Sequence, residues 1–177
     1  LAAVAFFGML GPRSDIATAA ATPRFLLKFV ITATLALTAL AAAAALSRPE
    51  AGPRGLGLLF AVPVLLAVAV LAEMMLVPMP DWPARFIGNN NMQCLVFIPL
   101  IGLAPLAVLL AAMRRGAPAR PRLAGAVAGL LAGGIAATFY AAHCTDDSPL
   151  FVATWYSIAI LALAGLGALA GSRALRW

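Results

Sequence analysis

The feature that most constrains the fold is a series of long apolar runs separated by short polar connectors. Each run is about 20 residues long, which is the length a helix needs to cross roughly 30 Å of hydrocarbon. The runs do not alternate apolar and polar residues with a period of two, as strands of a membrane barrel would. The chain is 64% hydrophobic and only 10% charged, with a mean hydropathy of +1.02. The sequence therefore predicts an all-α, polytopic transmembrane helix bundle.

Five complete spans are expected, at residues 25–46, 56–77, 95–113, 123–142 and 151–171. Residues 1–10, LAAVAFFGML, cover about half a bilayer, so we expect them to be the end of a truncated first span. The connectors are rich in Pro, Gly, Asn and Arg, and no internal repeat is evident. A single transmembrane domain over residues 1–177 is predicted.

The lysines and arginines indicate how the bundle is oriented, because connectors on the cytoplasmic side carry more of them. One set of alternate connectors and helix ends holds eight: Arg48, Arg54, Arg114, Arg115, Arg120, Arg122, Arg173 and Arg176. The other set holds four: Arg13, Arg24, Lys28 and Arg85. The first set is therefore predicted to be cytoplasmic and the connector HCTDDSP to face the periplasm of a Gram-negative cell. A pI of about 10.7 would suggest nucleic acid in a soluble protein. Here the bilayer is the expected partner of the arginines, and no direct nucleic-acid contact is expected.

Glycines recur every four residues in the last two spans, at Gly125, Gly129 and Gly133 and again at Gly167 and Gly171. Such small-residue ridges let helices approach closely in lipid. We therefore expect these spans to be tightly packed.

The stretch HCTDDSPLFVATWY, residues 143–156, concentrates the reactive side chains of the chain. It holds the only histidine, His143, and Cys144, one of two cysteines. The other, Cys94, begins the fourth span at the end where the fifth span finishes. Neighbouring antiparallel helices of matched length return their ends to one level, so we expect the two thiols to be close. Three interpretations remain open: a fixed disulfide, two inert buried thiols, and a redox- or metal-responsive pair.

Cys94, Cys144 and His143 also form a candidate metal site. Thiolate and imidazole ligands suit soft ions, and with a carboxylate they suit zinc or cadmium. The chain has no CxxC or HxxxH spacing that would close such a site. No resident cofactor is therefore expected, and any metal bound here would be a transient heavy-metal ion.

The acidic part of the motif has a structural interpretation. Asp147 or Ser148 is expected to cap the sixth helix, with Pro149 at its first position. Asp146 and Asp147 also suit the positive end of that helix.

Two further groups are expected near the membrane surface. Trp155 and Tyr156 lie within two turns of the start of the sixth helix, where an interfacial aromatic belt is typical. Glu73 lies a turn from the end of its span and is expected to snorkel or to pair with Arg85.

Together these stretches resemble the NrsF family of bacterial membrane anti-sigma factors. The resemblance rests on the motif HCTDDSPLFVATWY, the connector GPRSDIATAAATPRFLLK, the stretch NNNMQCLVFIPL and the basic turn RRGAPARPRLAGAVAG. It implies a six-span protein of the bacterial inner membrane that holds an extracytoplasmic-function (ECF) sigma factor and releases it on heavy-metal or oxidative stress. By the same resemblance, Cys94 and Cys144 would be the sensor on the periplasmic side. His143, Asp146, Asp147, Ser148, Pro149, Trp155 and Tyr156 would be the supporting motif. The family's cytoplasmic N-terminal segment, expected to be the main sigma contact, precedes the first span and is not in this sequence.

An alternative function is a small membrane transporter or metal-handling protein. Such a protein needs polar groups or broken helices near the bilayer midplane, where Thr32, Thr34 and Thr38 are the only polar cluster. An enzyme is not expected, because a lone histidine and one acid inside the spans provide no catalytic arrangement. The sequence leaves open the inducing signal, the identity of the sigma factor and the oligomeric state.

Overall fold

A computed structural model describes residues 1–47 and 53–175 of the chain. Arg48 and Arg176, which were counted for orientation, lie outside the described residues. Within them the chain is helical and has no strand. Helices long and apolar enough to cross a membrane occupy Pro23–Leu46, Leu56–Leu76, Asn91–Arg114, Pro121–Ala141 and Pro149–Ala174. The predicted all-α transmembrane bundle is confirmed, with each expected complete span matched by one of these segments.

The long helices are α3 (Pro23–Leu46), α4 (Ala61–Leu76), α6 (Asn91–Arg114), α7 (Pro121–Ala141) and α9 (Ser157–Ala174). A 3₁₀ segment η1 (Pro53–Phe60) leads into α4, and the short helix α8 (Pro149–Phe151) leads into α9 through a π-helical turn η3 (Val152–Tyr156). Shorter elements are α1 (Ala2–Met9), α2 (Ile16–Ala19), η2 (Met79–Asp81) and α5 (Trp82–Ile87).

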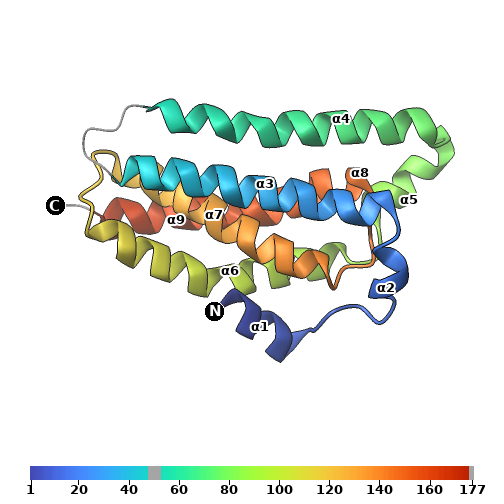
Figure 1. Cartoon of the computed structure of the whole chain (residues 1–177), viewed down its shortest axis with the longest axis horizontal. Coiled ribbons are helices and arrows are strands. Elements are labelled where there is room, and N and C mark those ends of the chain that lie inside the picture. Colours follow the sequence, from blue (N-terminus) through green and yellow to red (C-terminus); the bar gives the residue numbers. More distant parts are fainter. Residues whose placement is uncertain (48–52, 176–177) are drawn as a thin grey trace.

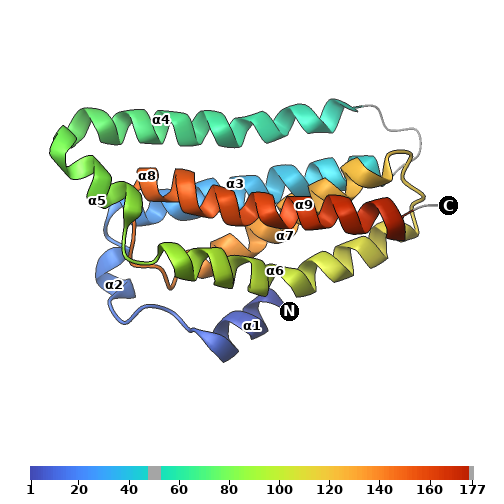
Figure 2. The same cartoon turned by 180° about the vertical axis from the view of Figure 1, so that it is seen from behind.

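Helix α7 is the centre of the bundle, with α3, α6 and α9 packed around it (Figures 1 and 2). In an 18-residue apolar window of α7, 67% is buried inside the bundle. In the corresponding window of the span that contains α4, only 11% is buried. Helix α4 stands at the edge of the bundle, and α1 lies against α6 and α7. This arrangement follows from composition, because the Ala- and Gly-rich α7 is the helix that neighbours can approach on several sides.

The glycine ridge is confirmed as the contact between α7 and α9. A Cβ atom added at Gly125 would meet the Gly167 carbonyl oxygen, and one added at Gly129 would meet the Leu163 carbonyl oxygen. The neighbouring atoms are backbone, which cannot rotate away. The absence of side chains at these positions is therefore what allows the two helices to touch.

Polar connectors gather at the two ends of the bundle. One end, called the motif end below, carries α2, α5 and the loop 142–148 that contains the HCTDDSP motif (Figure 1). The opposite end, called the basic end, carries the turn between α6 and α7 with Arg114, Arg115, Arg120 and Arg122.

Candidate functional site

The two cysteines lie together inside the motif end. Cys94, in the first turn of α6, and Cys144, just after α7, are both fully buried and belong to one cluster of buried residues. Both are free thiols. The Cys94 thiol and, more weakly, the Lys28 charge lower the pKa of Cys144, against the opposing effect of burial. The expected proximity is thus found, and no disulfide joins the two thiols in this structure.

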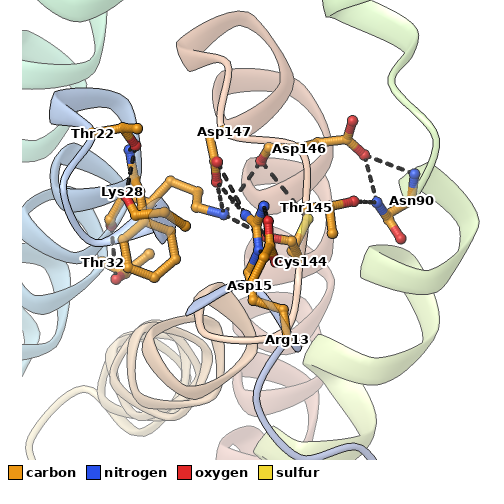
Figure 3. Close-up of polar contacts among 12 residues, drawn as sticks. Arg13, Asp15, Thr22, Lys28, Thr32, Asn90, Cys144, Thr145, Asp146 and Asp147 are labelled. Carbon is orange, nitrogen blue, oxygen red and sulfur yellow. Dashed lines mark hydrogen bonds and ion pairs between the residues drawn. The ribbon is translucent and has the colours of Figure 1, made fainter. Parts of the chain in front are cut away.

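Lys28 of α3 holds the loop that carries Cys144 (Figure 3). Its side chain is 1% exposed, and its Nζ donates to the Cys144 carbonyl oxygen at 2.8 Å and to the Asp146 carbonyl oxygen at 3.4 Å. The same ammonium group lies 2.5 Å from Asp147 Oδ1. A buried ammonium is tolerated because three oxygens replace its water shell.

The connector after α1 binds the same loop through both a backbone group and a side chain. The Arg13 N–H donates to the Ala142 carbonyl at 3.0 Å, and its guanidinium reaches Asp147 at 3.1 Å and the Cys144 carbonyl at 3.4 Å. Arg13 also binds Asp15 through two hydrogen bonds of 2.6 Å. These bonds lower the pKa of Asp15 and raise that of Arg13.

Asp146 caps α6 rather than its own helix. Its Oδ2 accepts from the backbone N–H groups of Asn89 at 3.0 Å and Asn90 at 2.8 Å, and from the Asn90 side chain at 2.8 Å. Asn90 is the N-cap position of α6 and makes no side-chain cap of its own. Asp146 therefore ties the loop to the helix that carries Cys94.

The predicted capping by Asp147 or Ser148 is wrong in its mechanism. Ser148 does occupy the N-cap position and Pro149 the first helical position, but no side-chain capping bond forms. Glu73 of α4 supplies the carboxylate instead. Its Oε2 accepts from Leu150 N–H at 3.2 Å and from the Ser148 hydroxyl at 2.6 Å. Asp147 is drawn away from the cap by Lys28 and Arg13.

Glu73 also forms the predicted pair with Arg85, at 3.2 Å, and a longer one with Arg24, at 3.5 Å. The carboxylate is buried, with 2% of its side chain exposed. It holds the otherwise weakly packed α4 to the start of the last span.

The prediction that Tyr156 belongs to an interfacial aromatic belt is wrong. It is 1% exposed, and its ring lies 5.9 Å from that of Tyr140 in the cluster that holds the thiols. The hydroxyl groups of both tyrosines are buried beside the thiols, Tyr140 near Cys94 and Tyr156 near Cys144, and make no well-formed hydrogen bond within the described part of the chain. Trp155, in contrast, is partly exposed, and its indole N–H donates to the Phe86 carbonyl at 2.8 Å.

His143 does not join the thiols. Its Nδ1 lies 3.0 Å from the Gly11 carbonyl oxygen, and its ring lies beside Tyr140. No group of three or more His, Cys, Asp or Glu side chains among the described residues is arranged to hold a metal ion. Cys94, Cys144 and His143 are therefore not grouped as a three-ligand site in this structure, where the His143 Nδ1 faces the Gly11 carbonyl.

The sequence did not single out Lys28 or Arg13 as site residues, although both were counted as charges. All four cations assigned to the motif end are paired: Arg13 and Lys28 with Asp147, and Arg24 and Arg85 with Glu73. The connector GPRSDIATAAATPRFLLK contains three of them, and this concentration of cations is the signal from which the network could have been predicted.

Two of the three midplane threonines are hydrogen-bonded within their own helix. Thr32 donates to the Lys28 carbonyl at 2.9 Å and Thr38 to the Thr34 carbonyl at 2.8 Å, each within its own helix. Hydroxyl groups engaged in this way are not free for a substrate.

Comparison with known proteins adds a family-level match. Residues 1–177 match the family NrsF, described as negative regulator of sigma F. The chain is 38% identical over 173 residues to "Anti-sigma-F factor NrsF" of Caulobacter vibrioides, covering 96% of this chain and 80% of that protein. It is 34% identical over 177 residues to "Probable anti-sigma-F factor NrsF" of Azospira oryzae, covering 99% and 83%. No solved structure is significantly similar.

Proposed function

The chain belongs to the NrsF family of negative regulators of sigma F, and we propose that it is itself a membrane-bound anti-sigma factor. In this proposal it holds an ECF sigma factor at the bacterial inner membrane. It releases that factor when heavy-metal or oxidative stress alters Cys94 and Cys144. The arginine-rich basic end faces the cytoplasm and the motif end faces the periplasm, as the eight-to-four distribution of lysine and arginine favours.

The observation that carries the sensor proposal is the burial of two free thiols together beneath a polar loop. A soft metal ion bound by both sulfurs would displace both thiol protons. An oxidant that accepts two electrons and two protons would leave a disulfide. Either product fixes the distance between α6 and the end of α7, which the reduced pair leaves free to vary.

The loop contacts provide a physical route for the signal. The Cys144 carbonyl accepts from Lys28 on α3 and from Arg13 on the connector after α1. Asp146, two residues further on, caps α6. A shift of Cys144 therefore acts at once on α3, on α6 and on the connector after α1. A coupling of about 1–3 kcal/mol between the thiols and the sigma factor is the usual size for such a device.

The test is stress-induced release of the sigma factor in the bacterial host, using full-length protein and a sigma-dependent reporter. The Cys94→Ala/Cys144→Ala variant is expected to hold the sigma factor before and after exposure to cadmium or peroxide. Met92→Ala is the matched control, because Met92 is an exposed sulfur-containing residue two positions from Cys94. Normal release in the double cysteine variant, at equal protein abundance, would end the sensor proposal while leaving the anti-sigma function in place.

A further inference from the structure

Five arginines of the basic end differ from the cations of the motif end in having no acidic partner among the described residues. Arg114, Arg115, Arg120, Arg122 and Arg173 are exposed and take part in none of the ion pairs between described residues. The acids of the described residues, Asp15, Glu73, Asp81, Asp146 and Asp147, all lie toward the motif end. The basic end therefore presents positive charge that this part of the chain does not neutralise.

Two adjoining hollows lie beside these arginines, where α7 begins and α9 ends. The larger has a volume of about 470 Å³ and is lined by Arg120, Arg122, Leu123, Ala126 and Ala168. The smaller, about 340 Å³, shares Arg122 and adds Leu169 and Ser172. Together they form a shallow, open groove lined by two arginines and by mainly apolar side chains.

The packing of the two helices explains the groove. Gly171 lies against the Pro121 carbonyl and Gly125, so the end of α9 touches the start of α7. Ala126 and Ala168, one position beyond Gly125 and Gly167, have side chains too short to fill the space beside this crossing. The first turn of α7 also has no side-chain cap, so its free N–H groups add to the positive potential beside the groove.

We infer that this groove binds an anionic diacyl phospholipid, with its phosphate against Arg120 and Arg122 and an acyl chain along Leu123, Ala126 and Ala168. The apolar lining belongs to helices that cross the membrane, so in place it faces hydrocarbon, while the arginines stand at headgroup level. A protein partner would satisfy the arginines but would not fill an apolar groove below the membrane surface. Arginine is suited to the role, because its planar guanidinium binds phosphate in a bidentate way.

The experiment is native mass spectrometry of the full chain in detergent, with phosphatidylglycerol and phosphatidylcholine of identical acyl chains as probes. The wild-type chain is expected to retain phosphatidylglycerol about 30-fold better, because two arginines attract its net negative charge, which the choline ammonium cancels in phosphatidylcholine. Arg120→Gln/Arg122→Gln should abolish the preference, whereas the matched pair Arg114→Gln/Arg115→Gln should keep it. Ala168→Phe, which fills the groove without changing charge, should release the lipid. Its melting temperature shows whether the fold is kept, and Ala126→Leu replaces it if the fold is lost.

Several results would overturn the inference. An equal loss in both arginine pairs means diffuse attraction, and retention of lipid by a folded groove-filling variant means that no acyl chain lies there. Displacement by glycerol phosphate alone means that the site recognises a free phosphate. Loss of sigma-factor binding in Arg120→Gln/Arg122→Gln with unchanged lipid binding assigns these arginines to a protein partner. Each readout is independent of Cys94 and Cys144, so the lipid site stands or falls apart from the sensor.

Discussion

Lys28 is the residue on which the geometry of the motif end depends most. An ammonium group with 1% of its side chain exposed has no water of its own. Its stability in a membrane-spanning helix depends on the carbonyls of Cys144 and Asp146 and on the carboxylate of Asp147. Burying such a charge without partners would cost several kcal/mol. The loop and the lysine therefore fix each other's positions.

Replacing Lys28 with methionine tests this dependence. The change leaves Asp147 with Arg13 as its remaining ion-pair partner and the Cys144 carbonyl without its short bond. A loss of about 3 kcal/mol in unfolding free energy is expected, measured by denaturation in detergent micelles. Arg24→Met is the control, because Arg24 is 44% exposed and pairs at only 3.5 Å; its cost should stay below about 1 kcal/mol. Equal costs for the two variants would show that Lys28 does not anchor the loop.

For Tyr156 we predict a substitution that raises the free energy of unfolding, in contrast to the loss expected for Lys28. Its hydroxyl is buried without a hydrogen-bond partner among the described residues, which carries a desolvation penalty. Tyr156→Phe removes the oxygen and keeps the ring, so the free energy of unfolding should rise by about 1 kcal/mol. Trp155→Phe, which loses the bond to the Phe86 carbonyl, should not be stabilising. A loss of stability in Tyr156→Phe would mean that an internal water or a thiol satisfies the phenol.

At this scale the sequence predicts some contacts and misses others for a clear reason. Helix length alone brings Cys94 and Cys144 to one level, and the Glu73–Arg85 pair links neighbouring segments of chain. The burial of Tyr156 was not predicted, because the π-helical turn at Val152–Tyr156 adds a residue to the turn and redirects the side chains that follow. Hydropathy is insensitive to such a turn. The partners of Lys28 are more than a hundred residues away, and span lengths do not say which helix faces meet.

At the scale of elements, the apolar runs locate each complete span but not its true ends. Helix α6 begins at Asn91 rather than at residue 95, because polar residues form its first turn and Asp146 binds the backbone N–H groups of Asn89 and Asn90 just before it. The last span begins at Pro149 rather than at residue 151, since Glu73 provides the cap from another helix. The glycine spacing was informative because a small-residue ridge acts through backbone contact, which sequence spacing describes directly.

Gly129 gives the element-scale prediction. A Cβ atom there would press on the Leu163 carbonyl oxygen and lie 2.6 Å from the Ala164 Cα, so α7 and α9 would have to separate. Gly129→Ala should lower the free energy of unfolding by about 1–3 kcal/mol. Gly165→Ala in α9 is the matched control, because nothing lies within 4 Å of a Cβ there. It should be neutral or stabilising by up to about 1 kcal/mol. Similar losses in both, measured by thermal unfolding in detergent, would exclude close packing at Gly129 as the cause.

At the scale of the whole molecule, the two ends of the bundle differ in whether their cations are paired with acidic side chains. The cations of the motif end are absorbed into ion pairs with Asp15, Glu73 and Asp147, which hold the connectors and the loop in place. At the basic end, five arginines are exposed and take part in no ion pair with a described residue: Arg114, Arg115, Arg120, Arg122 and Arg173. One end is therefore built for a fixed internal geometry, and the other for contact with what lies outside the chain.

The last prediction concerns the orientation of the bundle in the membrane, which depends on the unequal number of lysines and arginines at its two ends. Insertion follows the number of lysines and arginines rather than net charge, so the ion pairs of the motif end should not matter for it. The bias is eight against four, and replacing Arg114, Arg115, Arg120 and Arg122 with glutamine reduces it to four against four. A reporter that is active only in the periplasm, fused after residue 177, should be silent in the wild-type chain and active in a fraction of the variant molecules. Asp15→Asn/Asp147→Asn, which removes acids and leaves the cation count unchanged, should remain silent. Reporter activity already present in the wild-type chain would reverse the proposed orientation and place both thiols on the cytoplasmic side.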